Sequence, residues 1–173
     1  ILTGLLTAEE TASLARGLAS ASADLAKTTI YFTHYRFEAL YRLGQAGRIL
    51  EQLQLWHGLS DSGLRTTVES PEPTRSDCHA WGAHPLYHFH ASILGIRPSS
   101  PGFKQVRIAP QIGDTSSVEG KLPHPDGFIC VSIRKTGNDY KAVIELPCAI
   151  SGVFDWAGKT FDLKPGKTEL SLA

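Results

Sequence analysis

The chain has 173 residues, enough for one domain of ordinary size or for a helical part joined to a small β domain. Its 17 lysines and arginines balance its 17 aspartates and glutamates, which excludes the strong surface charge that binds nucleic acid or an anionic membrane. A neutral substrate suits this balance better than a charged one, and no apolar run is long enough to span a bilayer. Because no methionine is present, we expect the chain to be a segment of a longer polypeptide.

The N-terminal part shows the spacing of hydrophobic residues that is typical of helices. Thr7 and Glu10 form a capping-box pattern, which predicts a helix over about residues 8–19. Later apolar runs predict three more helices, of which the first is buried and joined to the second in an antiparallel hairpin at Gly44. These helices are expected over residues 31–43, 46–57 and 85–94. Residues 60–75, rich in Ser, Gly and Pro, are predicted to form a long loop, a kind of segment that is often functional.

Beyond Pro98 the hydrophobic residues alternate with a period of two, as they do in strands. The clearest alternating runs lie at residues 106–108, 129–133 and 140–146. Gly137 and Asn138 form a good hairpin turn between the last two runs. The chain is therefore predicted to have a two-part α+β architecture. Residues 1–98 form the helical part, and residues 99–173 form a small antiparallel β-sandwich.

A dense group of chemically active side chains lies near the junction of these parts, in residues 76–85. It contains His79, Trp81 and His84, and Glu69 precedes it in the predicted loop. These residue types suit sugar chemistry, because a carboxylate exchanges a proton with water, imidazoles bond hydroxyl groups, and an indole face covers the C–H edges of the ring. Each also has an ordinary structural interpretation, since loop glutamates are commonly solvated and tryptophans commonly lie in cores.

Other kinds of site fit the same segment less well. Five potential zinc ligands lie within thirteen residues, namely Cys78, His79, His84, His88 and His90. They lack the HExxH pattern, and two adjacent residues rarely reach one ion. The three cysteines show no CxxC spacing, and neither a GxSxG elbow nor a glycine-rich phosphate loop is present. We therefore expect no metal and no cofactor, and a zinc protein is kept as an alternative that elemental analysis would test.

Taken together, the motifs resemble those of a known family. Glu69 lies one residue beyond a Thr-Thr pair, and further motifs precede and follow it. The matching motifs are YF at 31–32, FEAL at 37–40, SDCHAWGAHPLY at 76–87, LGIRP at 94–98, PGF at 101–103 and VRIAP at 106–110. In this combination the chain resembles the C-terminal portion of bacterial α-L-rhamnosidases, glycoside hydrolase family 78, over nearly its whole length.

The resemblance implies a fold, an activity and partners. Residues 1–98 would be the last hairpins of an α/α six-hairpin barrel, and residues 99–173 the C-terminal β-sandwich of the family. Such enzymes release terminal α-L-rhamnose with inversion, so a rhamnose-containing glycan or glycoside is the expected substrate. The general acid of the family lies upstream of the part covered here. The fragment alone is therefore expected to be inactive without the N-terminal part of the same polypeptide.

The resemblance also assigns roles to the candidate residues. Glu69 would correspond to the general base and His79 to a histidine that contacts the sugar. Trp81 and His84 would serve in stacking and in support of the site. An alternative from another class is a noncatalytic carbohydrate-binding or scaffolding module, in which the sandwich presents Trp156 as a platform for a sugar.

Overall fold

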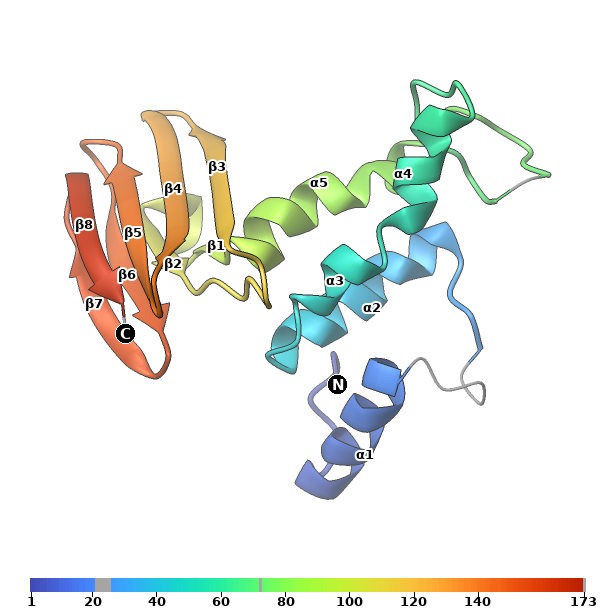
Figure 1. Ribbon diagram of the computed structural model, residues 1–173, viewed down its shortest axis with the longest axis horizontal. Helices are drawn as coiled ribbons and strands as arrows, with labels where there is room; N and C mark the ends of the chain where they lie inside the picture. The colour runs from blue at the N-terminus through green and yellow to red at the C-terminus, as the bar shows by residue number, and fades with distance from the viewer. Residues whose placement is uncertain (21–25, 72, 173) are drawn as a thin grey trace. The chain divides into compact units, whose positions relative to one another are not determined.

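The computed structural model describes residues 1–20, 26–71 and 73–172 (Figure 1). The chain divides into two compact units, Ile1–His88 and Phe89–Ala173. Within the described residues, no helix is both long enough and apolar enough to cross a membrane. The helical residues fall mainly in the first unit and every strand of the described part falls in the second.

The helical unit begins with the predicted capping box. The Thr7 N–H donates to Glu10 Oε2 (2.8 Å), and the Glu10 N–H donates to Thr7 Oγ1 (3.2 Å), so two N–H groups at the helix start are satisfied. The helices of this unit are α1 (Ala8–Ser20), α2 (Ile30–Arg42), α3 (Arg48–Glu51), α4 (Gln54–Asp61) and α5 (His84–His88), with a 3₁₀ turn over Ala80–Ala83. Gly44 follows α2 with φ +73°, the left-handed conformation predicted for a glycine at this end. Phe37 and Leu40 of α2 and Ile49 of α3 are fully buried and form its core.

Two of the predicted helices are divided in the structure. The expected helix over residues 46–57 is interrupted near Gln52 and Leu53, which separate α3 from α4, so the prediction of one continuous helix is wrong. The expected helix over residues 85–94 continues from α5 into a π-helical turn, Phe89–Ile93. It ends at the predicted Gly95, where φ is +67° and a Cβ would lie 2.1 Å from the Ala109 carbonyl oxygen, so only glycine fits.

The second unit is a sandwich of two four-stranded sheets. One sheet has the order β1-β2-β6-β7 and the other β3-β4-β5-β8. The strands are β1 (Ile96–Pro98), β2 (Gln105–Ile108), β3 (Ser117–His124), β4 (Gly127–Thr136), β5 (Asp139–Leu146), β6 (Ser151–Trp156), β7 (Lys159–Leu163) and β8 (Gly166–Leu172), with a 3₁₀ turn over Pro101–Phe103. The predicted turn at Gly137 joins β4 to β5, in which Lys135 pairs with Tyr140.

The core of the sandwich comes from the alternating residues that the period of two predicts. Val106, Ile108, Ile133 and Ile144 are fully buried, and they come from both sheets. Among the described strands the pairing is antiparallel except between β2 and β6, which run parallel, so the expectation of a wholly antiparallel sandwich is corrected at this pair.

The sandwich predicted for the C-terminal part is therefore confirmed. Strand β1 ends at Pro98 and pairs with β2, so it belongs to the sandwich, whereas the helical unit of the structure ends at His88. A division of the full-length protein into domains at residues 1–98 and 99–173 stays a prediction.

Candidate active site

Glu69 and His79 lie on two facing arms of the loop that follows α4. The His79 N–H donates to the Thr67 carbonyl (2.7 Å), and the Glu69 N–H donates to the Ser76 carbonyl (3.0 Å). The Thr67 hydroxyl adds a bond to the His79 carbonyl (2.6 Å). These backbone bonds fold the loop back on itself and fix the predicted base beside the predicted sugar-contacting histidine.

Gly82 lets the 3₁₀ turn before α5 pack closely against the loop. A Cβ at Gly82 would lie 2.8 Å from the Thr67 Cβ and 3.0 Å from the Val68 carbonyl oxygen, so a larger residue would push the two segments apart. The Trp56 indole N–H also donates to the Gly82 carbonyl (2.6 Å). Val68 is only 2% exposed, which anchors the residue directly before Glu69.

The Glu69 side chain is 13% exposed, and its carboxylate is ion-paired with Arg75. Arg75 Nε donates to Glu69 Oε2 (3.1 Å), and Arg75 Nη2 donates to the second carboxylate oxygen. The hydrogen bonding from Arg75 lowers the pKa of Glu69, and the charges of Arg75 and His79 add to this against the opposing effect of partial burial. Glu69 is therefore ionised at neutral pH, as a group that removes a proton from water must be.

His79 and Trp81 form an aromatic surface next to the loop. Their ring centroids are 4.3 Å apart, and Trp81 is 42% exposed. Trp81 also meets Tyr31 of α2 edge-on at 5.6 Å, and the hydroxyl groups of Tyr31 and Tyr35 lie 3.1 Å apart. His79 Nδ1 is buried without a hydrogen-bond partner within the described residues. The surface thus offers rings for stacking and hydroxyl groups for hydrogen bonding.

His84 lies apart from this surface, among the helices. Its Nε2 lies 3.0 Å from the Ile30 carbonyl oxygen, and its ring packs edge-on against Phe37 and Trp56 at 5.5 and 5.2 Å. Burial lowers the pKa of His84, an effect that the Ile30 carbonyl opposes and that nearby His34 reinforces. The structure therefore brings Glu69, His79 and Trp81 into one region and leaves His84 behind it.

Sequence reasoning did not identify three residues that the structure adds to this region. Arg75 is six residues from Glu69 in the same loop, and an arginine so close to a candidate base was an available signal. Tyr31 and Tyr35, one helical turn apart, were recognised only as apolar positions of a helix.

The helical unit also contains a groove of 1040 Å³, which lies between residues such as Phe32, Trp56 and Pro71. Neither Glu69 nor Trp81 lines this groove.

Trp156, the alternative sugar platform, lies in β6 of the sandwich. It is partly buried, its ring centroid is 5.2 Å from that of Tyr140, and it stacks on Phe154 at 6.3 Å. Its contacts on two sides are those of a residue at the edge of a core.

Comparison with known proteins gives concordant matches. Residues 95–153 match the bacterial alpha-L-rhamnosidase C-terminal domain. An alpha-L-rhamnosidase of Alteromonas sp. (strain LOR) is 37% identical over 67 residues, which are 38% of this chain and 7% of that protein. The chain thus spans a small fraction of its relative.

Solved structures extend the similarity to most of the chain. The GH78 family rhamnosidase of Bacillus sp. GL1 superposes with a TM-score of 0.79 and 28% identity, over 89% of this chain and 18% of that one. The Streptomyces avermitilis alpha-L-rhamnosidase complexed with L-rhamnose gives 0.68, at 18% identity over 82% of this chain and 17% of that one. The alpha-L-rhamnosidase from Dictyoglumus thermophilum gives 0.73, at 16% identity over 93% of this chain and 22% of that one. The last two show the shared fold.

The class that these matches share is the glycoside hydrolases, and this chain is homologous to a part of such an enzyme. In particular, it resembles the C-terminal portion of bacterial α-L-rhamnosidases of family GH78, which confirms the resemblance found in its motifs.

Proposed function

We propose that this chain is the base-carrying part of an inverting glycoside hydrolase that releases terminal α-L-rhamnose from glycosides or polysaccharides. The observation that carries the proposal is the ionised Glu69 carboxylate, which the loop holds beside His79 and the exposed ring of Trp81. The named activity of the matching proteins supplies the sugar. A neutral sugar also suits a chain whose charges balance.

In the proposed reaction, Glu69 removes a proton from a water molecule as that water attacks the anomeric carbon. A second carboxyl group protonates the departing oxygen on the opposite face, and such pairs stand about 6.5–9.5 Å apart in inverting enzymes. We place this general acid outside residues 1–173, in the larger part of the polypeptide. The chain alone is then expected to be inactive.

The ion pair with Arg75 is compatible with Glu69 acting as the general base. A carboxylate has about four lone-pair positions, so the two bonds from Arg75 leave Glu69 able to accept a water molecule. Arg75 is also 85% exposed, so a bound substrate could displace it without disturbing a packed core. His79 would donate to or accept from a sugar hydroxyl, Trp81 would cover the C–H face of the ring, and His84 would support the helices behind them.

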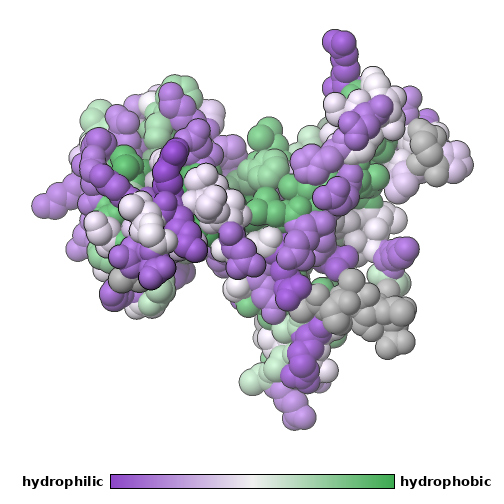
Figure 2. Space-filling view, in the orientation of Figure 1, coloured by the Kyte–Doolittle hydropathy of each residue, from purple (hydrophilic) through white to green (hydrophobic). Residues whose placement is uncertain are grey.

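The proposal also places the helical unit at the end of an α/α barrel. Large hydrophobic side chains of this unit remain exposed, including Tyr31 (42%), Phe32 (57%), Leu86 (65%) and Tyr87 (46%). On the visible face, hydrophobic residues gather over α5 (Figure 2). Such exposed apolar area favours a covering partner. The remaining barrel helices of the same polypeptide are the occupant that we propose.

Replacing Glu69 by Gln in the full-length protein tests the base. We expect kcat on an aryl α-L-rhamnoside to fall by about 10²–10⁴-fold, because glutamine cannot accept the proton from water. Glu9→Gln, an exposed carboxyl on α1, is the matched control and should leave kcat unchanged. Proton NMR of the first-formed product should show the inverted anomer. Hydrolysis at the wild-type rate by Glu69→Gln would exclude Glu69 as the base.

A further inference from the structure

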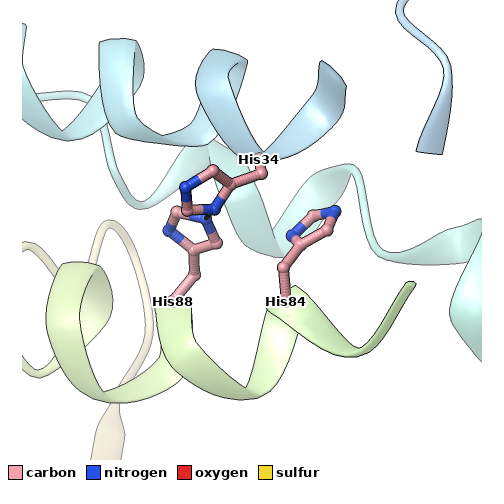
Figure 3. A group of neighbouring side chains, drawn as sticks. All are labelled: His34, His84 and His88. Atoms are coloured by element: carbon pink, nitrogen blue, oxygen red, sulfur yellow. Dashed lines mark hydrogen bonds between the residues drawn. The ribbon is translucent and has the colours of Figure 1, made fainter. Parts of the chain in front are cut away.

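Three histidines of the helical unit converge on one point between α2 and α5 (Figure 3). His34 comes from α2, whereas His84 and His88 are one helical turn apart on α5. One ring nitrogen of each lies within 4.8 Å of those of the other two, and His34 Nδ1 is 3.1 Å from His88 Nε2. His88 is fully buried, and the other two are partly buried.

The opposite nitrogens of two of these rings face oxygen atoms. His84 Nε2 lies 3.0 Å from the Ile30 carbonyl oxygen, and His88 Nδ1 lies 4.0 Å from Glu38 Oε1. A carbonyl only accepts hydrogen bonds, so His84 Nε2 carries the hydrogen and its Nδ1 presents a lone pair. A carbonyl or carboxylate behind the ring is the arrangement that orients histidines bound to metals.

The lone pair on His84 Nδ1 needs a partner that the described residues do not provide. This atom is buried and has no hydrogen-bond partner among them. A hydrogen bond between His34 Nδ1 and His88 Nε2 pairs those two nitrogens but leaves the buried His84 Nδ1 unpaired, which is unfavourable for a buried polar atom. A cation placed among the three nitrogens would satisfy all of them.

We propose that His34, His84 and His88 bind one divalent transition-metal ion of the zinc type. Imidazole is a preferred ligand of such ions, and three histidines with one open position form a known zinc geometry. Two nitrogens bound to tetrahedral zinc stand roughly 3.3 Å apart, close to the 3.1 Å between His34 and His88. The His84 nitrogen lies within 4.8 Å of the other two, so a rotation of its ring toward them completes the set.

The ion would fasten α2 to α5. Helix α2 carries Tyr31, and α5 directly follows the turn that carries Trp81, so the metal would hold together the two segments that form the aromatic surface. A water molecule or another external ligand would fill the fourth position. The site is independent of Glu69 chemistry, so a test of zinc binding and a test of hydrolysis can fail separately.

Zinc binding is measured on the metal-stripped 173-residue chain without an affinity tag, by competition with a chromogenic chelator. We expect one Zn²⁺ per chain. His34→Gln and His84→Gln should each weaken binding by at least about tenfold. His57→Gln, an exposed histidine on α4, should bind like the wild type. Absence of stoichiometric Zn²⁺ binding by the wild type, or equal affinity in all variants, would overturn the proposal.

Three further measurements exclude misfolding and a rival site. In the wild-type chain labelled with ¹⁵N-histidine, Zn²⁺ should shift the ring nitrogens of three histidines only, and these should be the resonances that His34→Gln and His84→Gln remove. Cys78→Ser should leave the affinity unchanged, and Co²⁺ should give no thiolate charge-transfer band. Shifts confined to His79, or loss of binding in Cys78→Ser, would assign the metal to the Cys78-His79 pair and overturn the proposal.

Discussion

At the scale of single residues, the ion pair of Arg75 with Glu69 controls when the proposed base is ionised. Arg75 lowers the pKa of Glu69, so removing the guanidinium should raise that pKa. A base works only when deprotonated, and the acid limb of the kcat/KM profile reports its pKa in the free enzyme. Arg75→Ala in the full-length protein should therefore move the acid limb to higher pH. The pH dependence of aryl rhamnoside hydrolysis measures this shift.

Arg65→Ala provides the control for that experiment, because Arg65 is an exposed arginine near the start of the same loop. It should leave the acid limb in place. An acid limb that stays at the same pH in Arg75→Ala, or one that moves downward, would contradict the assignment of that limb to Glu69.

The sequence could predict a shared site only for residues that lie close together in the chain. Glu69 and His79 are ten positions apart, and their motif indicated a shared site. His34 and His88 are 54 positions apart, so no spacing rule could connect them, and the metal ligands considered from the sequence were limited to one short segment. Their proximity depends on how α2 packs against α5.

At the scale of elements, Asp155 connects the strands of one sheet of the sandwich. It accepts from Thr160 Oγ1 on β7 (2.6 Å) and from Arg107 Nε on β2 (2.6 Å). The Thr160 bond lowers the pKa of Asp155, and Arg107 lowers it further against partial burial. Asp155→Asn should lower the free energy of unfolding at pH 7 by about 1 kcal/mol.

This loss should depend on pH with a defined sign. The folded pKa of Asp155 lies below its unfolded value of about 3.9, so the stabilisation is complete above that value and disappears as the pH falls through the folded pKa. Urea unfolding followed by tryptophan fluorescence should show wild type and Asp155→Asn converging at low pH. Asp162→Asn, an exposed position on β7, should match the wild type throughout. A difference that persists or grows in acid would contradict this account.

Local sequence signals predicted the ends of helices better than the interruptions within them. The Thr7 capping box, Gly44 and Gly95 marked helix ends correctly, because each acts on the backbone of the helix end where it lies. The break at Gln52 and the π-helical turn Phe89–Ile93 contain no proline or glycine that would have indicated them.

At the scale of the whole molecule, sequence patterns identified the sandwich but not its order of strands. The alternation in β4 and β5, joined at Gly137, predicted an antiparallel hairpin. The parallel pairing of Val106 with Gly152 joins segments 46 positions apart. Gly152 permits this close pairing, since a Cβ there would lie 1.9 Å from the Val106 carbonyl oxygen, but the glycine alone does not reveal its partner. The strand order therefore comes from the structure and not from the sequence pattern.

The proposed barrel predicts that substitutions of two exposed phenylalanines will change the stability of the full-length protein by different amounts. Phe32 on α2 is 57% exposed and Phe128 on β4 is 52% exposed, so the two look alike in this chain. If upstream barrel helices cover α2, Phe32→Gln should destabilise the full-length protein by about 1–3 kcal/mol through lost burial. Phe128→Gln should change its stability by less than about 0.5 kcal/mol, as surface substitutions do. In the 173-residue chain both substitutions should be nearly neutral, because both rings already face solvent. Chemical denaturation of the four variant proteins makes the comparison, and equal effects of the two substitutions in the full-length protein would show that the barrel helices leave α2 uncovered.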